Sequence, residues 1–312
     1  MTQFRVIFMG TPEFAVPALQ ALHESPHSVD LVVTQPDRPK GRGRRLAEPP
    51  VKQAAAELGY PVIQPASVKT EEFRNTIAGY RPDLFVVVAF GHILPKRLLE
   101  MPALGAINLH ASLLPKYRGP APIQWAIING EAETGVTSML MDAGLDTGEI
   151  LAVRKTPIHA DDTAGTLHDR LSRLSADVLH ETLKGFSSGT IRPTPQNHAA
   201  ASHAPLLKKS DGRLDWHRPA DYLERLIRGL SPWPGAYTYW GKKRLNIYRA
   251  EVRARTEVAS PGTIIQGFEN ELRVAAGEDA LSILEIQGAS GRRMEISEFL
   301  KGSPVSAGTV LT

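Results

Sequence analysis

Two polar side chains spaced two residues apart are the first candidates for chemistry in this sequence. Asn108 and His110 follow a short apolar run at residues 105–107. Residues i and i+2 of an extended chain point to the same side. An amide N–H can stabilise an oxyanion, and an imidazole can donate or accept a proton near neutral pH. The pair therefore predicts a site that polarises a carbonyl group at the carboxyl end of a strand, where open α/β sheets bind ligands.

A carboxylate further along the chain could complete this site. Asp146 lies in the run Asp142-Ala-Gly-Leu-Asp-Thr-Gly148, and the glycines on either side of it allow tight turns. Such turns could aim the carboxylate into a cleft, where it would orient the imidazole or accept a proton. The alternative, an Asx-type turn that only joins two strands, is the simpler interpretation of these residues taken alone.

The sequence offers no activated nucleophile and no metal-binding motif. Ser112 precedes Leu-Leu-Pro instead of forming a nucleophile elbow, and the chain has no cysteine. Direct attack by a substrate group on a polarised carbonyl is therefore favoured over a covalent enzyme intermediate. The 10 histidines show no i, i+4 pair with a third ligand, and no HExxH or Walker motif is present, so we expect no metal.

Alternating strand and helix patterns must position these residues. Apolar runs at residues 4–9, 31–34 and 83–90 read as strands, and the last is apolar on both faces, as in a central parallel strand. Helical patterns lie between them, for example at about residues 71–79, and at residues 163–185. The alternation predicts a doubly wound α/β sheet. Because Gly10 is followed by Thr-Pro-Glu-Phe, the Gly-x-Gly-x-x-Gly fingerprint is missing, and we expect no NAD or FAD.

The composition changes after residue 189. Residues 190–205 are rich in proline and alanine without periodicity, which predicts a linker between a domain at residues 1–189 and a second domain at residues 206–312. The second part contains short strand-like runs separated by turns, which indicates a small β-rich domain. A length of 312 residues fits two domains.

Positive charge is concentrated in two places. Residues 190–255 carry 13 Lys+Arg against 5 Asp+Glu, whereas residues 1–189 carry 19 against 20. Residues 38–45 hold five further basic side chains on a Gly-containing segment that has no apolar content to fold around. This distribution favours a polyanionic partner, although a solvated surface loop is the plainer alternative for residues 38–45.

Aromatic side chains accompany the basic ones in the second part. Trp216, Trp233 and Trp240 lie there, and Trp240 is close to the cluster Lys242-Lys243-Arg244. Aromatics interleaved with Lys and Arg suit contact with nucleic acid. The alternative is that the tryptophans fill a small core or a seam between the domains, and for Trp233 we expect that alternative.

The rest of the composition points to a cytoplasmic protein. No apolar run approaches the roughly 20 residues needed to span a bilayer. The N-terminal residues enter a strand pattern at once, which leaves no room for a signal peptide. We therefore expect a cytoplasmic protein without a membrane partner.

Several motifs resemble the signature of the folate-dependent formyltransferases. They are Asn108-Leu-His-Ala-Ser-Leu-Leu-Pro115, Tyr117-Arg-Gly119 and Asp142-x-Gly-x-Asp-Thr-Gly148. Residues 8–15, 41–43 and 230–236 match as well, so the resemblance covers essentially the whole chain. One departure is Phe90, where the family pattern leads us to expect a tyrosine.

The resemblance implies a fold, a reaction and its participants. The fold would be a Rossmann-like formyltransferase domain followed by an OB-like β-barrel. The co-substrate would be 10-formyltetrahydrofolate, and the acceptor the α-amino group of methionine on initiator tRNA. Asn108 and His110 would polarise the formyl oxygen, while Asp146 would orient His110 and accept the amine proton. The folate would lie against residues 112–115, namely Ser112, Leu113, Leu114 and Pro115.

The resemblance also implies how the RNA is bound. Arg42, on a segment expected to be disordered before RNA binds, would read the acceptor end of the tRNA, and other basic residues would contact phosphates without specifying sequence. We expect a monomer. The residues expected to bind tRNA are Arg38, Lys40, Arg42, Arg44, Arg45, Lys208, Lys209, Lys242, Lys243 and Arg244.

Two other functions remain to be separated from this one. A sister enzyme that formylates a small amine, such as an amino sugar or a purine precursor, would need neither the basic segment nor the basic, aromatic second domain. An RNA-binding protein on an inactive fold would have no reason to keep Asn108, His110 and Asp146 together.

Overall fold

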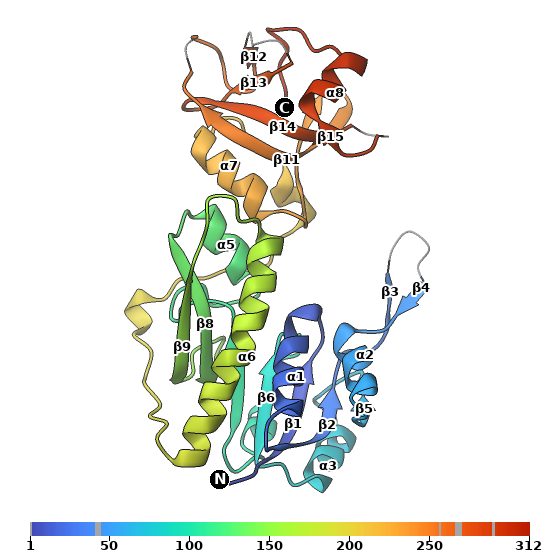
Figure 1. Ribbon diagram of the computed structural model, residues 1–312, viewed down its shortest axis with the longest axis vertical. Coiled ribbons are helices and arrows are strands. Elements are labelled where there is room, and N and C mark those ends of the chain that lie inside the picture. Colours follow the sequence, from blue (N-terminus) through green and yellow to red (C-terminus); the bar gives the residue numbers. More distant parts are fainter. Residues whose placement is uncertain (1, 41–44, 256, 266–269, 289–290) are drawn as a thin grey trace. The chain divides into compact units, whose positions relative to one another are not determined.

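The structure is a computed structural model and consists of two compact units, which we describe separately. It describes residues 2–40, 45–255, 257–265, 270–288 and 291–312, and of Lys40 and Arg45 only the backbone (Figure 1). The first unit comprises Met1–Pro122, Glu133–Pro157 and His168–Ala204, and the second comprises Ile123–Ala132, Ile158–Leu167 and Pro205–Thr312. The domain boundaries expected at residues 189 and 205 stay predictions.

The first unit is built on a seven-stranded sheet in the order β5-β2-β1-β6-β7-β8-β9. The first five strands of that order are parallel, and β8 and β9 are antiparallel to their neighbours. The predicted doubly wound α/β arrangement therefore applies to the parallel part of the sheet. The strands are β1 (Arg5–Gly10), β2 (Ser28–Val33), β5 (Val62–Ile63), β6 (Leu84–Val88), β7 (Ala106–His110), β8 (Glu133–Leu140) and β9 (Ile150–Pro157).

Helices cover this sheet because their apolar faces need burial. In α3, Phe73 and Ile77 lie one turn apart and join the core formed by the buried strand residues, including Phe85. Thr70 caps α3 by accepting a hydrogen bond from the backbone N–H of Phe73 at 3.2 Å. The helices among the described residues of the first unit are η1 (Glu13–Ala15), α1 (Val16–His23), α2 (Pro50–Glu57), α3 (Glu71–Gly79), α4 (Lys96–Leu99), most of α6 (Ala164–Ser188) and η2 (His198–Ala200).

The basic segment at residues 38–45 differs from the loop that the sequence predicted. Strands β3 (Arg38–Lys40) and β4 (Arg45–Ala47) pair in antiparallel fashion and extend away from the sheet of the first unit (Figure 1). Backbone hydrogen bonding, which does not require apolar side chains, thus gives both flanks a regular structure. Arg42 and Arg44 lie outside the described residues, and the disorder expected of the whole basic segment before RNA binds stays a prediction.

The second unit contains an antiparallel sheet in the order β10-β11-β14-β13-β12, with β15 paired to β14. This sheet curls into a half-barrel of the OB-like type. The described elements of the second unit are η3 (Lys209–Gly212), α7 (Ala220–Gly229), β10 (Ala236–Trp240), β11 (Lys243–Arg253), β12 (Ile264–Ile265), β13 (Leu272–Ala275), β14 (Ala280–Gln287), β15 (Met294–Glu295) and α8 (Ile296–Gly302), together with most of α5 (Pro122–Ile128).

The tryptophans of the second unit have different environments. Trp216 is buried, and its indole N–H donates to the Thr238 hydroxyl at 3.0 Å. Trp233 is 51 % exposed, so the prediction that it fills a core is wrong, whereas its expected place in a seam between the domains stays a prediction. It lies on the turn between α7 and β10, where Leu230 supplies the buried side chain instead.

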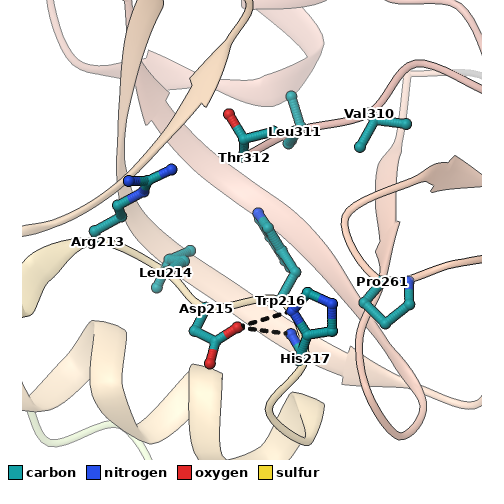
Figure 2. Close-up of a pocket in the computed structure, with 9 residues that line it drawn as sticks. All are labelled: Arg213, Leu214, Asp215, Trp216, His217, Pro261, Val310, Leu311 and Thr312. Carbon is teal, nitrogen blue, oxygen red and sulfur yellow. Dashed lines mark hydrogen bonds and ion pairs between the residues drawn. The ribbon is translucent and has the colours of Figure 1, made fainter.

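A pocket of about 420 Å³ opens in the second unit (Figure 2). Trp216 and Leu311 form part of its apolar wall, and Arg213 lies at its edge. Asp215 accepts a hydrogen bond from the backbone N–H of His217 at 3.1 Å, which lowers the pKa of the Asp215 carboxyl. The pocket therefore combines an apolar wall with a charged rim.

Candidate active site

Strand β7 delivers the first two site residues to the edge of the sheet. Ala106, Ile107 and Leu109 are buried, which anchors the strand between β6 and β8. His110, at the carboxyl end of β7, is 7 % exposed, and Asn108 is half-buried. Within the described residues the Asn108 side chain has no hydrogen-bond partner, so its amide is available to a bound group.

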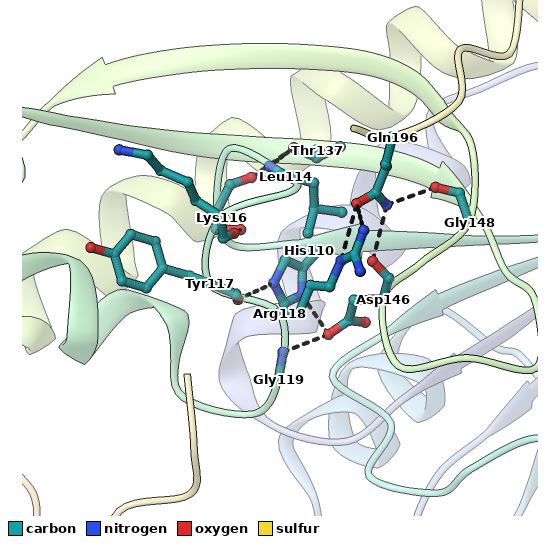
Figure 3. Close-up of polar contacts among 11 residues, drawn as sticks. His110, Leu114, Lys116, Tyr117, Arg118, Gly119, Thr137, Asp146, Gly148 and Gln196 are labelled. Atoms are coloured by element: carbon teal, nitrogen blue, oxygen red, sulfur yellow. Dashed lines mark hydrogen bonds and ion pairs between the residues drawn. The ribbon is translucent and has the colours of Figure 1, made fainter. Parts of the chain in front are cut away.

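The imidazole of His110 is fixed by a backbone carbonyl. Its Nε2 atom lies 2.9 Å from the carbonyl oxygen of Tyr117 (Figure 3). A carbonyl oxygen only accepts hydrogen bonds, so Nε2 carries the proton and donates. In the neutral imidazole Nδ1 is then unprotonated. His110 therefore presents a proton acceptor at Nδ1, and it becomes a donor there only after gaining a second proton.

Asp146 faces that nitrogen. Its Oδ2 atom lies 3.7 Å from Nδ1 of His110, and the two side chains are only 13 % and 7 % exposed. The same oxygen accepts a hydrogen bond from the backbone N–H of Gly119 at 2.8 Å (Figure 3). The fold thus brings together a carboxylate and an imidazole that lie 36 residues apart in the chain. A proton placed between them would interact with both groups.

The loop that carries Asp146 contains both an Asx-type turn and a carboxylate directed to the site, the two alternatives that the sequence allowed. Asp142 makes the Asx-type turn, since its Oδ1 atom accepts from the backbone N–H of Gly144 at 2.9 Å and from the Thr147 hydroxyl at 2.6 Å. Asp146 has a φ of 53°, and its carboxylate is left for the site. At Gly148 a Cβ atom would lie 1.6 Å from the carbonyl oxygen of Leu140, so the turn excludes any larger residue there.

Residues 112–115 form a loop that is tied to β8. The Ser112 hydroxyl donates to the carbonyl oxygen of Lys116 at 2.6 Å, which agrees with its exclusion as a nucleophile. The Thr137 hydroxyl donates to the Ser112 carbonyl at 2.7 Å and accepts from the backbone N–H of Leu114 at 3.2 Å. Leu113 and Pro115 are half-buried. These bonds hold the loop next to His110, where the folate contact stays a prediction.

A half-buried histidine, His92, follows the carboxyl end of the neighbouring strand β6. Burial, followed by the nearby charge of Arg38, lowers the pKa of His92. Its Nε2 atom is buried and has no hydrogen-bond partner among the described residues. Its ring meets that of Phe90 edge-on at 5.2 Å between centroids. Phe90 is 2 % exposed, so the residue that departs from the family pattern belongs to the core.

Gln196 belongs to the site but was not singled out from the sequence. It is 6 % exposed and donates hydrogen bonds to the carbonyl oxygens of Asp146 and Gly148, while it accepts from Arg118 (Figure 3). It lies within the Pro- and Ala-rich residues 190–205, which have no periodicity. No local signal marks a buried glutamine in such a stretch.

The expected tRNA contacts are distributed over both units. Arg38 donates to the side chain of Gln35. Only the backbone of Lys40 and Arg45 is described, and Arg42 and Arg44 lie outside the described residues. The five remaining residues belong to the second unit, where η3 contacts β10 and β10 pairs with β11. They are Lys208, Lys209, Lys242, Lys243 and Arg244.

Aromatic rings underlie several basic side chains of the second unit. The Arg244 guanidinium lies 3.7 Å from the centroid of the Tyr237 ring, and that of Arg213 lies 5.7 Å from the Tyr239 ring. Lys243 lies 5.5 Å from the Trp240 ring. Such pairs present positive charge and flat aromatic surface together.

The described part of the chain holds neither a metal-binding cluster nor a membrane-spanning helix. Among residues 2–40, 45–255, 257–265, 270–288 and 291–312, no three His, Asp or Glu side chains gather as a metal ion would require. In the same ranges no helix is both long and apolar enough to cross a membrane.

Solved structures with the same fold include formyltransferases with other acceptors. A sugar 3N-formyl transferase, WlaRD, aligns with a TM-score of 0.67 at 16 % identity over 94 % of this chain and 100 % of that one. HypX from Aquifex aeolicus, solved in complex with tetrahydrofolic acid, aligns with a TM-score of 0.60 at 18 % identity over 100 % of this chain and 51 % of that one. At these identities the likeness establishes the fold.

Sequence comparison identifies the family. Residues 3–183 match the formyl transferase family, and residues 206–304 match the formyl transferase C-terminal domain. A methionyl-tRNA formyltransferase of Trichlorobacter lovleyi is 51 % identical over 311 residues, which cover 100 % of this chain and 98 % of that protein. One of Desulfotalea psychrophila is 51 % identical over 308 residues, covering 98 % and 95 %. The chain belongs to the formyl transferase family and, within it, to the methionyl-tRNA formyltransferases.

Proposed function

We propose that this chain transfers the formyl group of 10-formyltetrahydrofolate to the α-amino group of methionine on initiator tRNA. The observation that carries the proposal is the pairing of His110 with Asp146 beside the Asn108 amide, which has no partner among the described residues, in a chain of this family. The site fits acyl transfer without a covalent intermediate, because the Ser112 hydroxyl is engaged and the chain has no cysteine.

The donor supplies the reactive formyl carbon when it is bound. In the net reaction a C–N bond to the amine forms, the C–N bond to the donor breaks, and one proton passes from the amine to the leaving nitrogen. An α-amino group titrates near about 8, so a useful fraction of it is neutral and nucleophilic at pH 7. The enzyme therefore has to stabilise the oxyanion and hold the proton during transfer.

Three side chains stabilise the oxyanion and hold the proton. The amide N–H of Asn108 has no competing partner in the part of the chain that the structure describes, and it donates to the formyl oxygen. His110 is held by the Tyr117 carbonyl with Nδ1 unprotonated, so the amine proton enters the space between Nδ1 and the Asp146 carboxylate, directly or through water. Once protonated on Nδ1, the imidazolium is stabilised by Asp146 and can donate to the oxyanion or to the leaving nitrogen.

The basic residues are proposed to bind the acceptor. Residues 38–45, which follow β2 of the catalytic unit, would contact the acceptor end, with Arg42 as its reader. In the second unit, charge and aromatic surface occur together at Arg244 over Tyr237, which suits RNA backbone and exposed bases. Domains at residues 1–189 and 206–312, joined by residues 190–205, are supported by family matches that end at residue 183 and resume at residue 206.

The cellular setting follows from the acceptor. Charged initiator tRNA is used in translation, so we place the activity in the cytoplasm. A catalytic unit and an RNA-binding unit on one chain provide the functions that the reaction needs, so we propose that a monomer suffices. Sedimentation of the free protein tests this point, since a stable dimer at assay concentrations would contradict it.

The direct test is transfer of labelled formyl from 10-formyltetrahydrofolate to methionyl initiator tRNA. Methionyl elongator tRNA and methionine amide serve as competing acceptors under the same conditions. We expect rapid labelling of the initiator tRNA and far slower labelling of the other two. No labelling of initiator tRNA would overturn the proposal, and preferential labelling of the free amide would indicate a small-amine formyltransferase.

A further inference from the structure

Residues 194–204 connect the two loops that form the active site. The backbone N–H of Arg118 donates to the Ser202 carbonyl at 2.9 Å, and that of Ala204 donates to the Arg118 carbonyl at 2.8 Å. The Ser202 hydroxyl also accepts from the backbone N–H of Tyr117 at 2.9 Å. This segment is therefore hydrogen-bonded to the loop whose Tyr117 carbonyl holds His110.

The same segment reaches the loop of Asp146 through one side chain. The Nε2 atom of Gln196 donates to the carbonyl oxygens of Asp146, at 2.9 Å, and of Gly148, at 2.7 Å. Its Oε1 atom accepts from Nη2 of Arg118 at 2.6 Å and from Nε at 3.2 Å (Figure 3). Both hydrogens and both lone pairs of the amide are thereby used inside a buried site.

Contacts at Asp146 stabilise an infrequent backbone conformation. Its φ of 53° lies in the left-handed region, which residues other than glycine adopt infrequently, although aspartate and asparagine tolerate it better than most. Residues 142–148 belong to no helix or strand, so regular backbone pairing does not fix this conformation. The two carbonyl bonds from Gln196 fall on Asp146 itself and on the glycine two residues later, where the backbone must turn.

We propose that Gln196 is a positioning residue for formyl transfer, holding the Asp146 loop in register with the loop that fixes His110. The inference rests on the proposed function and adds to it a residue that touches neither substrate. Arg118 is the link, because it bonds to Gln196 through its side chain while its backbone neighbours are Tyr117 and Gly119. Loss of this link would let the Asp146 carboxylate drift from Nδ1 of His110.

Two substitutions isolate the donated hydrogen bonds. Gln196→Glu keeps the size and the acceptor for Arg118 but loses the donor to both carbonyls. Gln196→Met also loses the donor and introduces no charge. Asn197→Ala is the matched control, because Asn197 is the adjacent residue and is exposed, and among the described residues its side chain bonds only to the local backbone N–H of Ala199.

We expect both Gln196 variants to lower kcat by about ten- to hundredfold, since a displacement of about 1 Å in a catalytic group has an effect of this size. The KM for methionyl-tRNA should stay within about twofold, because no acceptor contact is removed. Hydrogen exchange of backbone amides at residues 142–149 should accelerate in both variants and stay unchanged in Asn197→Ala.

The outcomes are distinguishable. If kcat of both variants stays within about threefold of an active wild-type protein, or if exchange at residues 142–149 is unchanged, Gln196 has no positioning role. A rise in KM with unchanged kcat would likewise overturn the inference, since it would indicate a binding contact. If the wild-type protein itself fails to formylate methionyl-tRNA, the proposed function fails first, independently of the exchange result.

Discussion

Removing the charge of Asp146 is the most direct test of the proposed proton pathway. In Asp146→Asn the side chain keeps its size, and its remaining oxygen can still accept the hydrogen bond that Gly119 donates at 2.8 Å. What is lost is the negative charge 3.7 Å from Nδ1 of His110. The substitution therefore probes electrostatic stabilisation of the protonated imidazole with little change in shape.

The size of the effect follows from this separation and the burial of both groups. For unit charges 3.7 Å apart, Coulomb's law with an effective dielectric constant of about 20 gives an attraction of about 4 kcal/mol. A loss of about 4 kcal/mol in the transition state corresponds to a decrease of about a thousandfold in the rate of the chemical step. The decrease should appear in kcat, because the charge acts only after the proton has moved.

Single-turnover formylation with enzyme in excess measures this step without product release. Asp142→Asn is the control, because Asp142 lies in the same loop, is exposed, and makes its turn contacts through an oxygen that asparagine keeps. We expect the control to retain activity within about threefold. A folded Asp146→Asn protein that loses less than about tenfold would refute the assignment, since charge stabilisation would then be worth under about 1.4 kcal/mol.

Three further predictions concern RNA binding and stability. Arg42→Ala should reduce formylation far more than tRNA affinity, measured in parallel on initiator tRNA; equal losses would make Arg42 a plain phosphate contact. Arg244→Ala should weaken tRNA binding about three- to tenfold and reduce the salt dependence of log K by about 1, and an unchanged salt slope would contradict phosphate contact. Burial, followed by the charge of His180, lowers the pKa of His27, so its neutral form favours the folded state. This contribution is complete above the unfolded pKa of about 6.5 and is lost as the pH falls below it. The unfolding temperature should therefore drop between about pH 7.5 and pH 5.5, and less so in His27→Asn; identical profiles would exclude His27 as the cause.

Much of the fold could be predicted because local patterns encode it. The helix expected at residues 71–79 is observed as α3 (Glu71–Gly79), since an N-cap threonine and a periodic apolar face define it without outside help. The run at residues 83–90 was expected to form a central strand because it is apolar on both faces, and β6 (Leu84–Val88) lies within it. For Trp233 the expected place in a core was wrong, because the burial of a large side chain on a turn depends on what the chain packs against it.

The strand that carries the candidate site residues was also evident from local sequence. Asn108 and His110 lie at i and i+2 of a short apolar strand, so their types and their shared side could be predicted from spacing. The family resemblance then favoured a site role for Asp146 over the simpler Asx-type turn, and it added the formyl donor. Sequence therefore established the fold class and the family, and it supplied the candidate residues.

Tertiary structure decided how these residues work together. The proton on His110 is placed by the Tyr117 carbonyl, and the Asp146 loop is held by Gln196, a residue from a stretch expected to be only a linker. These contacts join segments up to 50 residues apart and involve backbone carbonyls, which every residue type has. No pattern in the sequence marks which carbonyl will be used, because that choice is made only when distant loops pack against each other.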